Sequence, residues 1–201
     1  WKSYVDNLLA LGRLSDAREL IQQAKNRGAT GEGFQKLSSR VNDHNPQPKH
    51  LKKPSSDKIQ SVLELYRRGQ FNAVIGSATK MLEEFPTSEP LLQACGMAHS
   101  KLGQLDSAIE QYKTLIKAQP DSAVGYYGMG AILQSNGKLS DALKYFDRAI
   151  VINPNFAEAL YNKANALRDL GELNKAIENY QEALTIRPNY VEAVTNLGEV
   201  L

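Results

Sequence analysis

The chain has 201 residues, of which 24 are basic and 22 acidic, so its formal net charge at pH 7 is +2. Hydrophobic residues make up 42% and charged residues 23% of the chain, a composition that excludes a disordered protein. No apolar run approaches the roughly 18 residues of a membrane-spanning helix, and a single cysteine excludes a disulfide framework and a zinc cluster. The near-neutral charge disfavours nucleic acid as a partner.

The first part of the chain predicts a small helical segment over residues 1–42. Apolar residues at helical spacing, interrupted by Gly12, indicate a degenerate helical hairpin at 1–26. Residues 32–42 predict one short helix, because their apolar residues fall on a single helical face.

A linker is expected to follow at residues 43–54, which hold three prolines and little apolar surface. Residues 1–54 carry 10 basic and 5 acidic residues, a net charge of +5, whereas residues 55–201 carry 14 and 17, a net charge of −3. The lysines of the linker form only a small cluster without interleaved aromatic residues, unlike a nucleic-acid module. We expect a solvated linker, with a contact to an acidic partner as the alternative.

From residue 55 onward the sequence repeats with a period of 34 residues. Two residue types mark the period, and they recur at Gly69, Gly103, Gly137 and Gly171 and at Pro86, Pro120, Pro154 and Pro188. Between these markers, apolar residues recur at the i, i+4, i+7 spacing of an amphipathic helix. Each unit therefore predicts two helices, the first ended by glycine and the second by proline. Good N-cap residues for the second helices stand three positions after each glycine, at Asn72, Asp106, Ser140 and Asn174.

This pattern resembles the tetratricopeptide repeat, and the segment AEALYNKANALRDLGELNKAIENYQEALTIRPN at 157–189 matches it well. The repeats would be 55–88, 89–122, 123–156 and 157–190, with a partial fifth at 191–201, and the 1–26 hairpin would be a degenerate copy. The resemblance implies an all-α fold, a right-handed α–α superhelix that binds protein or peptide partners along its concave face.

The resemblance also implies which side chains line that face, since certain positions of each first helix point inward in the family. These positions hold Leu63, Tyr66, Arg67, Gln93, Met97, Lys101, Tyr127, Gln134, Tyr161, Asn162, Asn165, Arg168, Asp169 and Asn196. Tyrosine and arginine suit such a surface because they combine a large contact area with a polar end. Asparagine and glutamine can bond both the N–H and the C=O groups of an extended peptide.

Two kinds of repeat within the family bind their ligands through known positions, which can be compared with this sequence. Repeats that hold the carboxyl terminus of heat-shock chaperones carry lysine, arginine and asparagine at positions filled here by Ile59, Leu63, Ala94, Val124 and Gly128, which argues against that ligand. Repeats of O-linked N-acetylglucosamine transferase carry asparagine at the sixth position, which Asn162 and Asn196 match and Gln60, Ala94 and Gly128 do not.

No catalytic residue, metal site or cofactor site is expected in this chain. Cys95 and His99 share one helix face, a spacing that suits a nucleophile and its base or two metal ligands, but both fall on the stripe predicted to pack against the partner helix. Gly128 and Gly130 lack the third glycine and the preceding strand of a phosphate-binding loop, so they indicate close helix contact.

The sequence thus predicts a cytoplasmic protein-interaction scaffold that is not itself an enzyme. The alternative is the substrate-recruiting arm of a larger bacterial transferase, such as a sulfotransferase, glycosyltransferase or methyltransferase. The last predicted helix, 191–201, would expose Val194, Leu197 and Leu201. We therefore expect this helix to pack against further repeats, another domain or a second copy by self-association.

Overall fold

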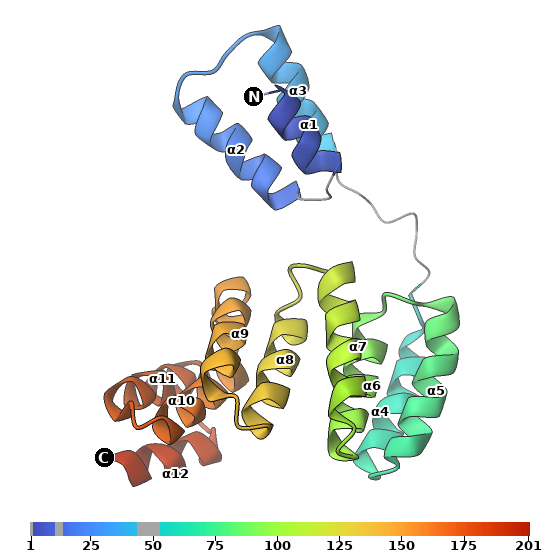
Figure 1. Cartoon of the computed structure of the whole chain (residues 1–201), viewed down its shortest axis with the longest axis vertical. Coiled ribbons are helices and arrows are strands. Elements are labelled where there is room, and N and C mark those ends of the chain that lie inside the picture. Colours follow the sequence, from blue (N-terminus) through green and yellow to red (C-terminus); the bar gives the residue numbers. More distant parts are fainter. Residues whose placement is uncertain (1, 11–13, 44–52) are drawn as a thin grey trace. The chain divides into compact units, whose positions relative to one another are not determined.

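The computed structural model describes residues 2–10, 14–43 and 53–201, and all regular secondary structure in these ranges is α-helical. The helices form two compact units, which Figure 1 shows. The all-α prediction is confirmed. None of the described helices is long and apolar enough to cross a membrane.

The first unit consists of three helices, α1 (Lys2–Ala10), α2 (Leu14–Asn26) and α3 (Glu32–Asp43). Aliphatic side chains from all three form one core, made by Val5, Leu8, Ala17, Ile21, Leu37 and Val41. At its surface, Arg40 Nη2 lies 2.8 Å from Asp6 Oδ1 and ties α3 to α1. Of the predicted 43–54 linker, residues 44–52 lie outside the described ranges.

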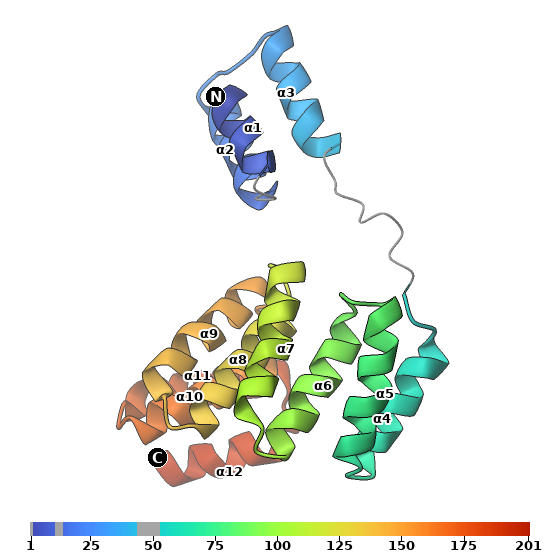
Figure 2. The same cartoon turned by 45° about the vertical axis from the view of Figure 1, so that its right-hand side comes forward.

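The second unit is a row of nine described helices, made up of four pairs and a last single helix. Figures 1 and 2 show the paired helices running antiparallel. The first helices of the four pairs are α4 (Ser56–Arg67), α6 (Glu89–Lys101), α8 (Ala123–Ser135) and α10 (Ala157–Asp169), and α12 (Val191–Val200) takes the same place without a second helix. The second helices are α5 (Phe71–Glu84), α7 (Leu105–Ala118), α9 (Leu139–Ile152) and α11 (Leu173–Ile186).

A glycine turn joins the two helices of every pair. Gly103 has a φ of 73°, and the other three periodic glycines have φ between 71° and 81°, a region that glycine enters without the penalty of a Cβ atom. The Gln104 N–H donates to the His99 carbonyl at 2.9 Å and the Gly103 N–H to the Ser100 carbonyl at 3.0 Å. These two bonds form a Schellman motif, which confirms that the glycines end the first helices.

The predicted N-caps of the second helices are wrong. The four second helices begin one residue before Asn72, Asp106, Ser140 and Asn174, so these residues lie in the first turn. The residue that directly follows each glycine is the true cap: the Ala108 N–H already donates to the Gln104 carbonyl at 3.0 Å. The Schellman turn leads directly into the next helix, so the second helix begins without a side-chain cap.

Small residues let the two helices of a pair approach closely. A Cβ atom added to Gly96 on α6 would lie 2.6 Å from the ring of Tyr112 on α7, and one added to Gly130 on α8 would lie 2.6 Å from the ring of Phe146 on α9. Real Cβ atoms do not come so near to another heavy atom. The rings of Tyr112 and Phe146 therefore pack directly against the backbone of α6 and α8.

The first helices gather on one side of the second unit. Each of them contacts the next along the row, from α4 to α6, α8, α10 and α12, whereas no comparable contact joins α5, α7, α9 and α11 in the described part of the chain. Helices that approach one another along a row lie on its inner side. At the end of the row, Val194 of α12 and Leu201, which follows the helix, are exposed as expected, and so is Val191. The expected exposure of Leu197 is wrong, because this side chain is partly buried against the cluster that contains Tyr180.

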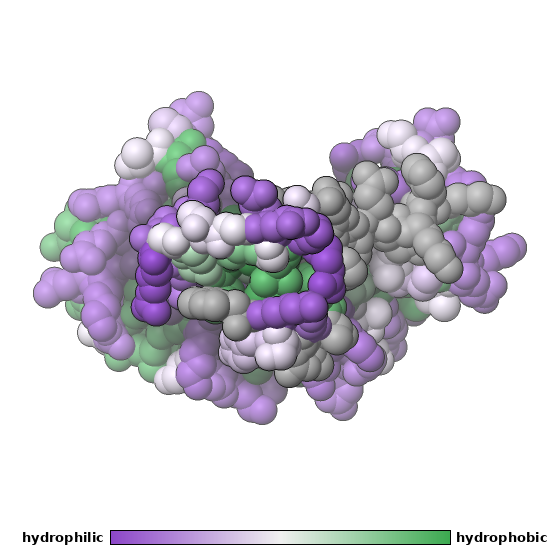
Figure 3. All heavy atoms as spheres, turned by 90° about the horizontal axis from the view of Figure 1, so that it is seen from above, coloured by the Kyte–Doolittle hydropathy of each residue, from purple (hydrophilic) through white to green (hydrophobic). Residues whose placement is uncertain are grey.

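Figure 3 shows hydrophilic residues over most of the face that is seen, with hydrophobic residues in smaller areas between them. This distribution agrees with the burial of apolar side chains between the helices, where leucines, alanines and aromatic residues form a separate cluster at each pair.

We predict that Gly130→Ala destabilises the second unit by about 1–2 kcal/mol, because the new methyl group must displace the fully buried Phe146 ring and this cost exceeds the gain in helix propensity. The matched control is Gly76→Ala in α5, where a Cβ would meet nothing within 4 Å. That variant should gain about 0.5–1 kcal/mol. Urea denaturation of both variants measures the difference, and equal stabilities would contradict the close packing.

Candidate binding face

The face formed by α4, α6, α8, α10 and α12, called the first-helix face below, carries the side chains that the sequence analysis singled out. None of the fourteen is buried: Leu63, Arg67, Lys101 and Asp169 are exposed, and the other ten are partly buried. Partly buried aromatic and amide side chains are held in place by neighbours and still offer surface to a ligand.

Two identical contacts between neighbouring repeats cross this face. Asn162 on α10 donates from Nδ2 to the hydroxyl of Tyr127 on α8 at 2.9 Å. One repeat later, Asn196 on α12 donates from Nδ2 to the hydroxyl of Tyr161 on α10 at 3.1 Å. In both pairs the partners are 35 residues apart in sequence. We call these two hydrogen bonds the amide–phenol ladder, since they join the first helices of three successive repeats.

Aromatic rings pack against both tyrosines of the ladder. The ring of Tyr127 lies 6.1 Å from that of Phe146 and 4.9 Å from that of Phe156. The ring of Tyr161 has the same neighbours one repeat later, Tyr180 at 6.0 Å and Tyr190 at 4.8 Å. The sequence analysis missed all four supporting rings as parts of the site. Their 34-residue spacing, from 146 to 180 and from 156 to 190, was the signal that could have found them.

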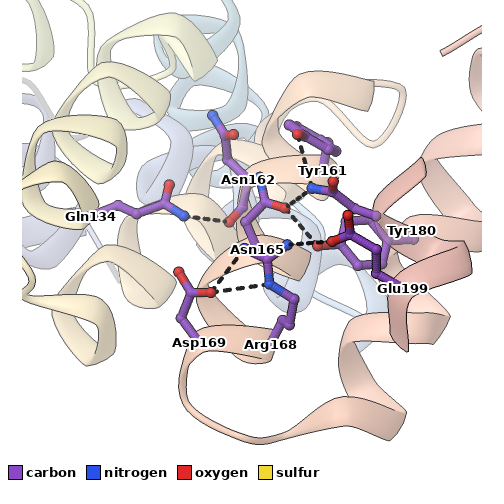
Figure 4. Close-up of polar contacts among 9 residues, drawn as sticks. Gln134, Tyr161, Asn162, Asn165, Arg168, Asp169, Tyr180 and Glu199 are labelled. Atoms are coloured by element: carbon purple, nitrogen blue, oxygen red, sulfur yellow. Dashed lines mark hydrogen bonds and ion pairs between the residues drawn. The ribbon is translucent and has the colours of Figure 1, made fainter. Parts of the chain in front are cut away.

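Asn165 is the centre of the polar network shown in Figure 4. Its Oδ1 accepts from the Tyr180 hydroxyl at 2.6 Å and from Asn196 Nδ2 at 2.8 Å. Nearby, Gln134 Nε2 donates to the backbone carbonyl of Asn162 at 3.3 Å. Some of the amide groups that the sequence analysis expected to bind a ligand are therefore bonded to other residues of the chain.

The network nevertheless leaves polar atoms without a partner among the described residues. The Oδ1 atoms of Asn162 and Asn196 accept no hydrogen bond from them, and Nδ2 of Asn165 donates none. Two acceptors and one donor thus stand on a surface whose geometry the other halves of the same amides fix. This is a suitable arrangement for the N–H and C=O groups of a peptide main chain.

Charged side chains are placed unequally along the face. Arg168 Nη2 lies 3.0 Å from Asp169 Oδ1, and Arg168 Nη1 lies 4.0 Å from Glu199 Oε2, so this cation is already matched by acids. Arg67 on α4 and Lys101 on α6 form no ion pair with the described residues. Unpaired positive charge therefore stands at the N-terminal end of the face.

Burial raises the pKa of three phenols at or beside the face. Loss of solvation raises the pKa of Tyr66 and Tyr127, and the nearby Glu158 carboxylate raises the pKa of Tyr127 further, against the opposing hydrogen bond from Asn162. Burial is also the main reason that the pKa of Tyr190 rises to about 12. At neutral pH every one of these hydroxyls can donate a hydrogen bond as well as accept one.

Cys95 and His99, the pair with nucleophile–base spacing, belong to different surroundings. Cys95 is 1% exposed in the core between α4, α5 and α6, and burial raises the pKa of its thiol, which opposes formation of a nucleophilic thiolate. The Nδ1 atom of His99 lies 2.6 Å from Oε1 of Gln104 at the end of the helix. These contacts assign Cys95 to packing and His99 to the turn.

Models of known protein families match the part of the chain from residue 96 to residue 201. A TPR repeat family model matches residues 96–137 and 164–201, and two tetratricopeptide repeat models match residues 123–156 and 145–178. Comparison with curated protein sequences found no match.

Similar solved structures include repeat proteins of several kinds. A crystal structure of MamA is 27% identical, with a TM-score of 0.58 over 68% of this chain and 80% of that one. The first TPR domain of human RPAP3 is 24% identical, with a TM-score of 0.53 over 55% of this chain and 87% of that one. PilF of Pseudomonas aeruginosa is 18% identical, with a TM-score of 0.67 over 72% and 66%. The last two show likeness of fold alone.

We predict that the amide–phenol ladder stabilises the contact between repeats. In a double-mutant cycle of Asn162→Ala and Tyr127→Phe, the coupling free energy of unfolding should be about 0.5–1.5 kcal/mol, the net value of one hydrogen bond. The control cycle pairs Asn162→Ala with Tyr145→Phe on α9, a tyrosine without a bond to Asn162, and should be additive. Equal coupling in the two cycles would contradict the ladder.

Three observations now agree: a 34-residue period marked by glycine and proline, paired antiparallel helices that begin and end within that period, and family models that match across residues 96–201. Repeats of this kind form an all-α superhelix whose helix pairs stack on their neighbours. The chain belongs to the tetratricopeptide repeat family and is built as a protein-interaction scaffold.

Proposed function

We propose that the first-helix face binds an extended segment of a protein partner. The observation that carries this proposal is the set of amide atoms left over by the polar network: Oδ1 of Asn162, Oδ1 of Asn196 and Nδ2 of Asn165. They come from two successive first helices and are held by hydrogen bonds to tyrosines. An extended main chain presents N–H and C=O groups in alternation, so it can bond to both acceptors and a donor carried by one face.

Amide side chains that are already held in place favour binding, because the ligand does not have to immobilise them. Association costs about 0.5–1.5 kcal/mol for each flexible side chain that it immobilises. Asn165 and Asn196 are already restrained by bonds to each other and to tyrosines, so most of this cost falls on folding. The C-terminal part of the face thus supplies a preorganised polar surface.

The N-terminal part of the face has a different character. Leu63 and Tyr66 on α4 and Met97 on α6 present apolar surface there, and Arg67 and Lys101 stand beside them without acidic partners. We expect a partner segment whose apolar side chains and occasional acidic residue lie at α4 and α6. Its main chain would continue across α10 and α12.

One of the similar structures, the first TPR of RPAP3, was solved with the HSP90 peptide SRMEEVD. That peptide ends in acidic groups, and the positions at which carboxylate-binding repeats carry lysine and asparagine hold Ile59, Leu63, Ala94, Val124 and Gly128 here. We therefore propose a peptide ligand that is recognised along its main chain and its apolar side chains, and not through a terminal carboxylate.

We predict that Asn162→Ala weakens peptide binding by about five- to tenfold, as expected for the loss of one or two hydrogen bonds at a preformed site. Tyr127→Ala should weaken it further, since the Asn162 amide and the α8–α10 contact both depend on that ring. The measurement is the Kd of the tightest peptide selected from a random twelve-residue library on the unmodified protein.

Asn174→Ala provides the matched control, since this asparagine is exposed on the second helix α11. The control should bind the selected peptide with unchanged affinity. Thermal unfolding of each variant separates lost binding from lost structure. Unchanged affinity in both Asn162→Ala and Tyr127→Ala would remove the first-helix face as the binding site.

A further inference from the structure

The second helix α7 carries the buried phenol of Tyr112. Tyr112 is only 4% exposed, and its hydroxyl bonds to none of the described residues. Among the described side chains, Ser88 Oγ is the single nitrogen or oxygen atom that is both unpaired and closed off from solvent. The Tyr112 hydroxyl therefore keeps an opening to solvent although the rest of its ring is enclosed.

Two glycines determine where that opening lies. A Cβ atom on Gly96 of α6 would stand 2.8 Å from Cζ of Tyr112, and one on Gly128 of α8 would stand 2.3 Å from the same atom. Cζ carries the hydroxyl, so the polar end of the ring passes between α6 and α8, both of which belong to the first-helix face. The hydroxyls of Tyr66 and Tyr127, two residues of that face, lie close enough to raise the pKa of Tyr112, after burial as the larger cause.

The same position two repeats later shows what such a hydroxyl binds. Tyr180 stands 68 residues after Tyr112, which is two full periods, and its hydroxyl donates to Asn165 Oδ1 at 2.6 Å. The residue two periods before Asn165 is Met97, which offers no amide. The second amide at Tyr180 comes from Asn196, and its counterpart is Gly128. Both amide groups are thus absent around Tyr112.

We propose that an amide carbonyl of the bound partner accepts the hydrogen bond of the Tyr112 hydroxyl, in the place that the Asn165 side chain occupies at Tyr180. This inference rests on the proposed function and names a contact of the same face. A neutral carbonyl is favoured over a carboxylate, because burying an unpaired charge beside Met97 and two glycines is costly.

We take the main chain of the partner as the source of that carbonyl, because an extended main chain carries a C=O group at every residue. An asparagine or glutamine side chain of the partner carries the same amide group and would use the same opening. Ala replacement of each such residue in the peptide distinguishes the two sources: lost affinity indicates a side-chain amide, and retained affinity indicates the main chain.

The test is Tyr112→Phe, which removes one oxygen atom and keeps the ring between the glycines. Because the hydroxyl has no hydrogen-bond partner among the described residues, the variant should unfold at the same temperature as the unmodified protein. The probe is again the tightest peptide from the random twelve-residue library. We expect its affinity to fall about fivefold, the effect of losing one neutral hydrogen bond. Tyr145→Phe on α9 is the control and should bind within twofold of the unmodified protein.

A second measurement reports on the hydroxyl itself. In protein labelled with ¹³Cζ-tyrosine, the resonance that disappears in Tyr112→Phe belongs to Tyr112, and added peptide should shift it. An unshifted resonance, or affinity of Tyr112→Phe within twofold of the unmodified protein, overturns this inference while leaving peptide binding by Asn162 intact. A library that yields no binding peptide overturns the proposed function and this contact together.

Discussion

The packing of an aromatic ring on a residue without a large side chain is the contact on which the rest of the second unit depends. Tyr112 lies against Gly96 and Phe146 against Gly130, and Tyr180 packs in one cluster with Ala164. Such contacts bring the backbones of paired helices close together, and close-packed interiors hold them there. The positions of α6, α8 and α10 relative to their second helices follow from this approach.

The amide–phenol ladder adds a polar connection between pairs that apolar packing has already placed. Asn162 and Asn196 reach the tyrosines of the preceding repeat because the ring stacks at Phe156 and Tyr190 hold those phenols in position. The same side chains stabilise the array with one half of the amide and offer the other half to solvent. A repeat protein can in this way fix the geometry of a binding surface without rigid loops, since each surface residue also belongs to an interface between repeats.

Differences between the repeats give the two ends of the face distinct chemistry. The C-terminal repeats satisfy Tyr180 internally through Asn165 and Asn196. Around Tyr112 the corresponding positions hold Met97 in the same repeat and Gly128 in the next one, and the phenol of Tyr112 has no hydrogen-bond partner among the described residues. The helical framework is the same in both places, so the difference lies in the side chains that occupy equivalent positions.

The sequence by itself determined the helix pairs, their glycine turns and their period, because these features depend on residues that are close together along the chain. It also placed Tyr127, Asn162 and Asn196 on the first helices. It did not determine the caps of the second helices, where the turn geometry replaced the expected side chains, nor the supporting rings of Phe156 and Tyr190. Only the tertiary structure decided which amide atoms are used within the chain and which remain open. Their partners are 15 to 35 residues away in sequence and meet only when neighbouring repeats pack together.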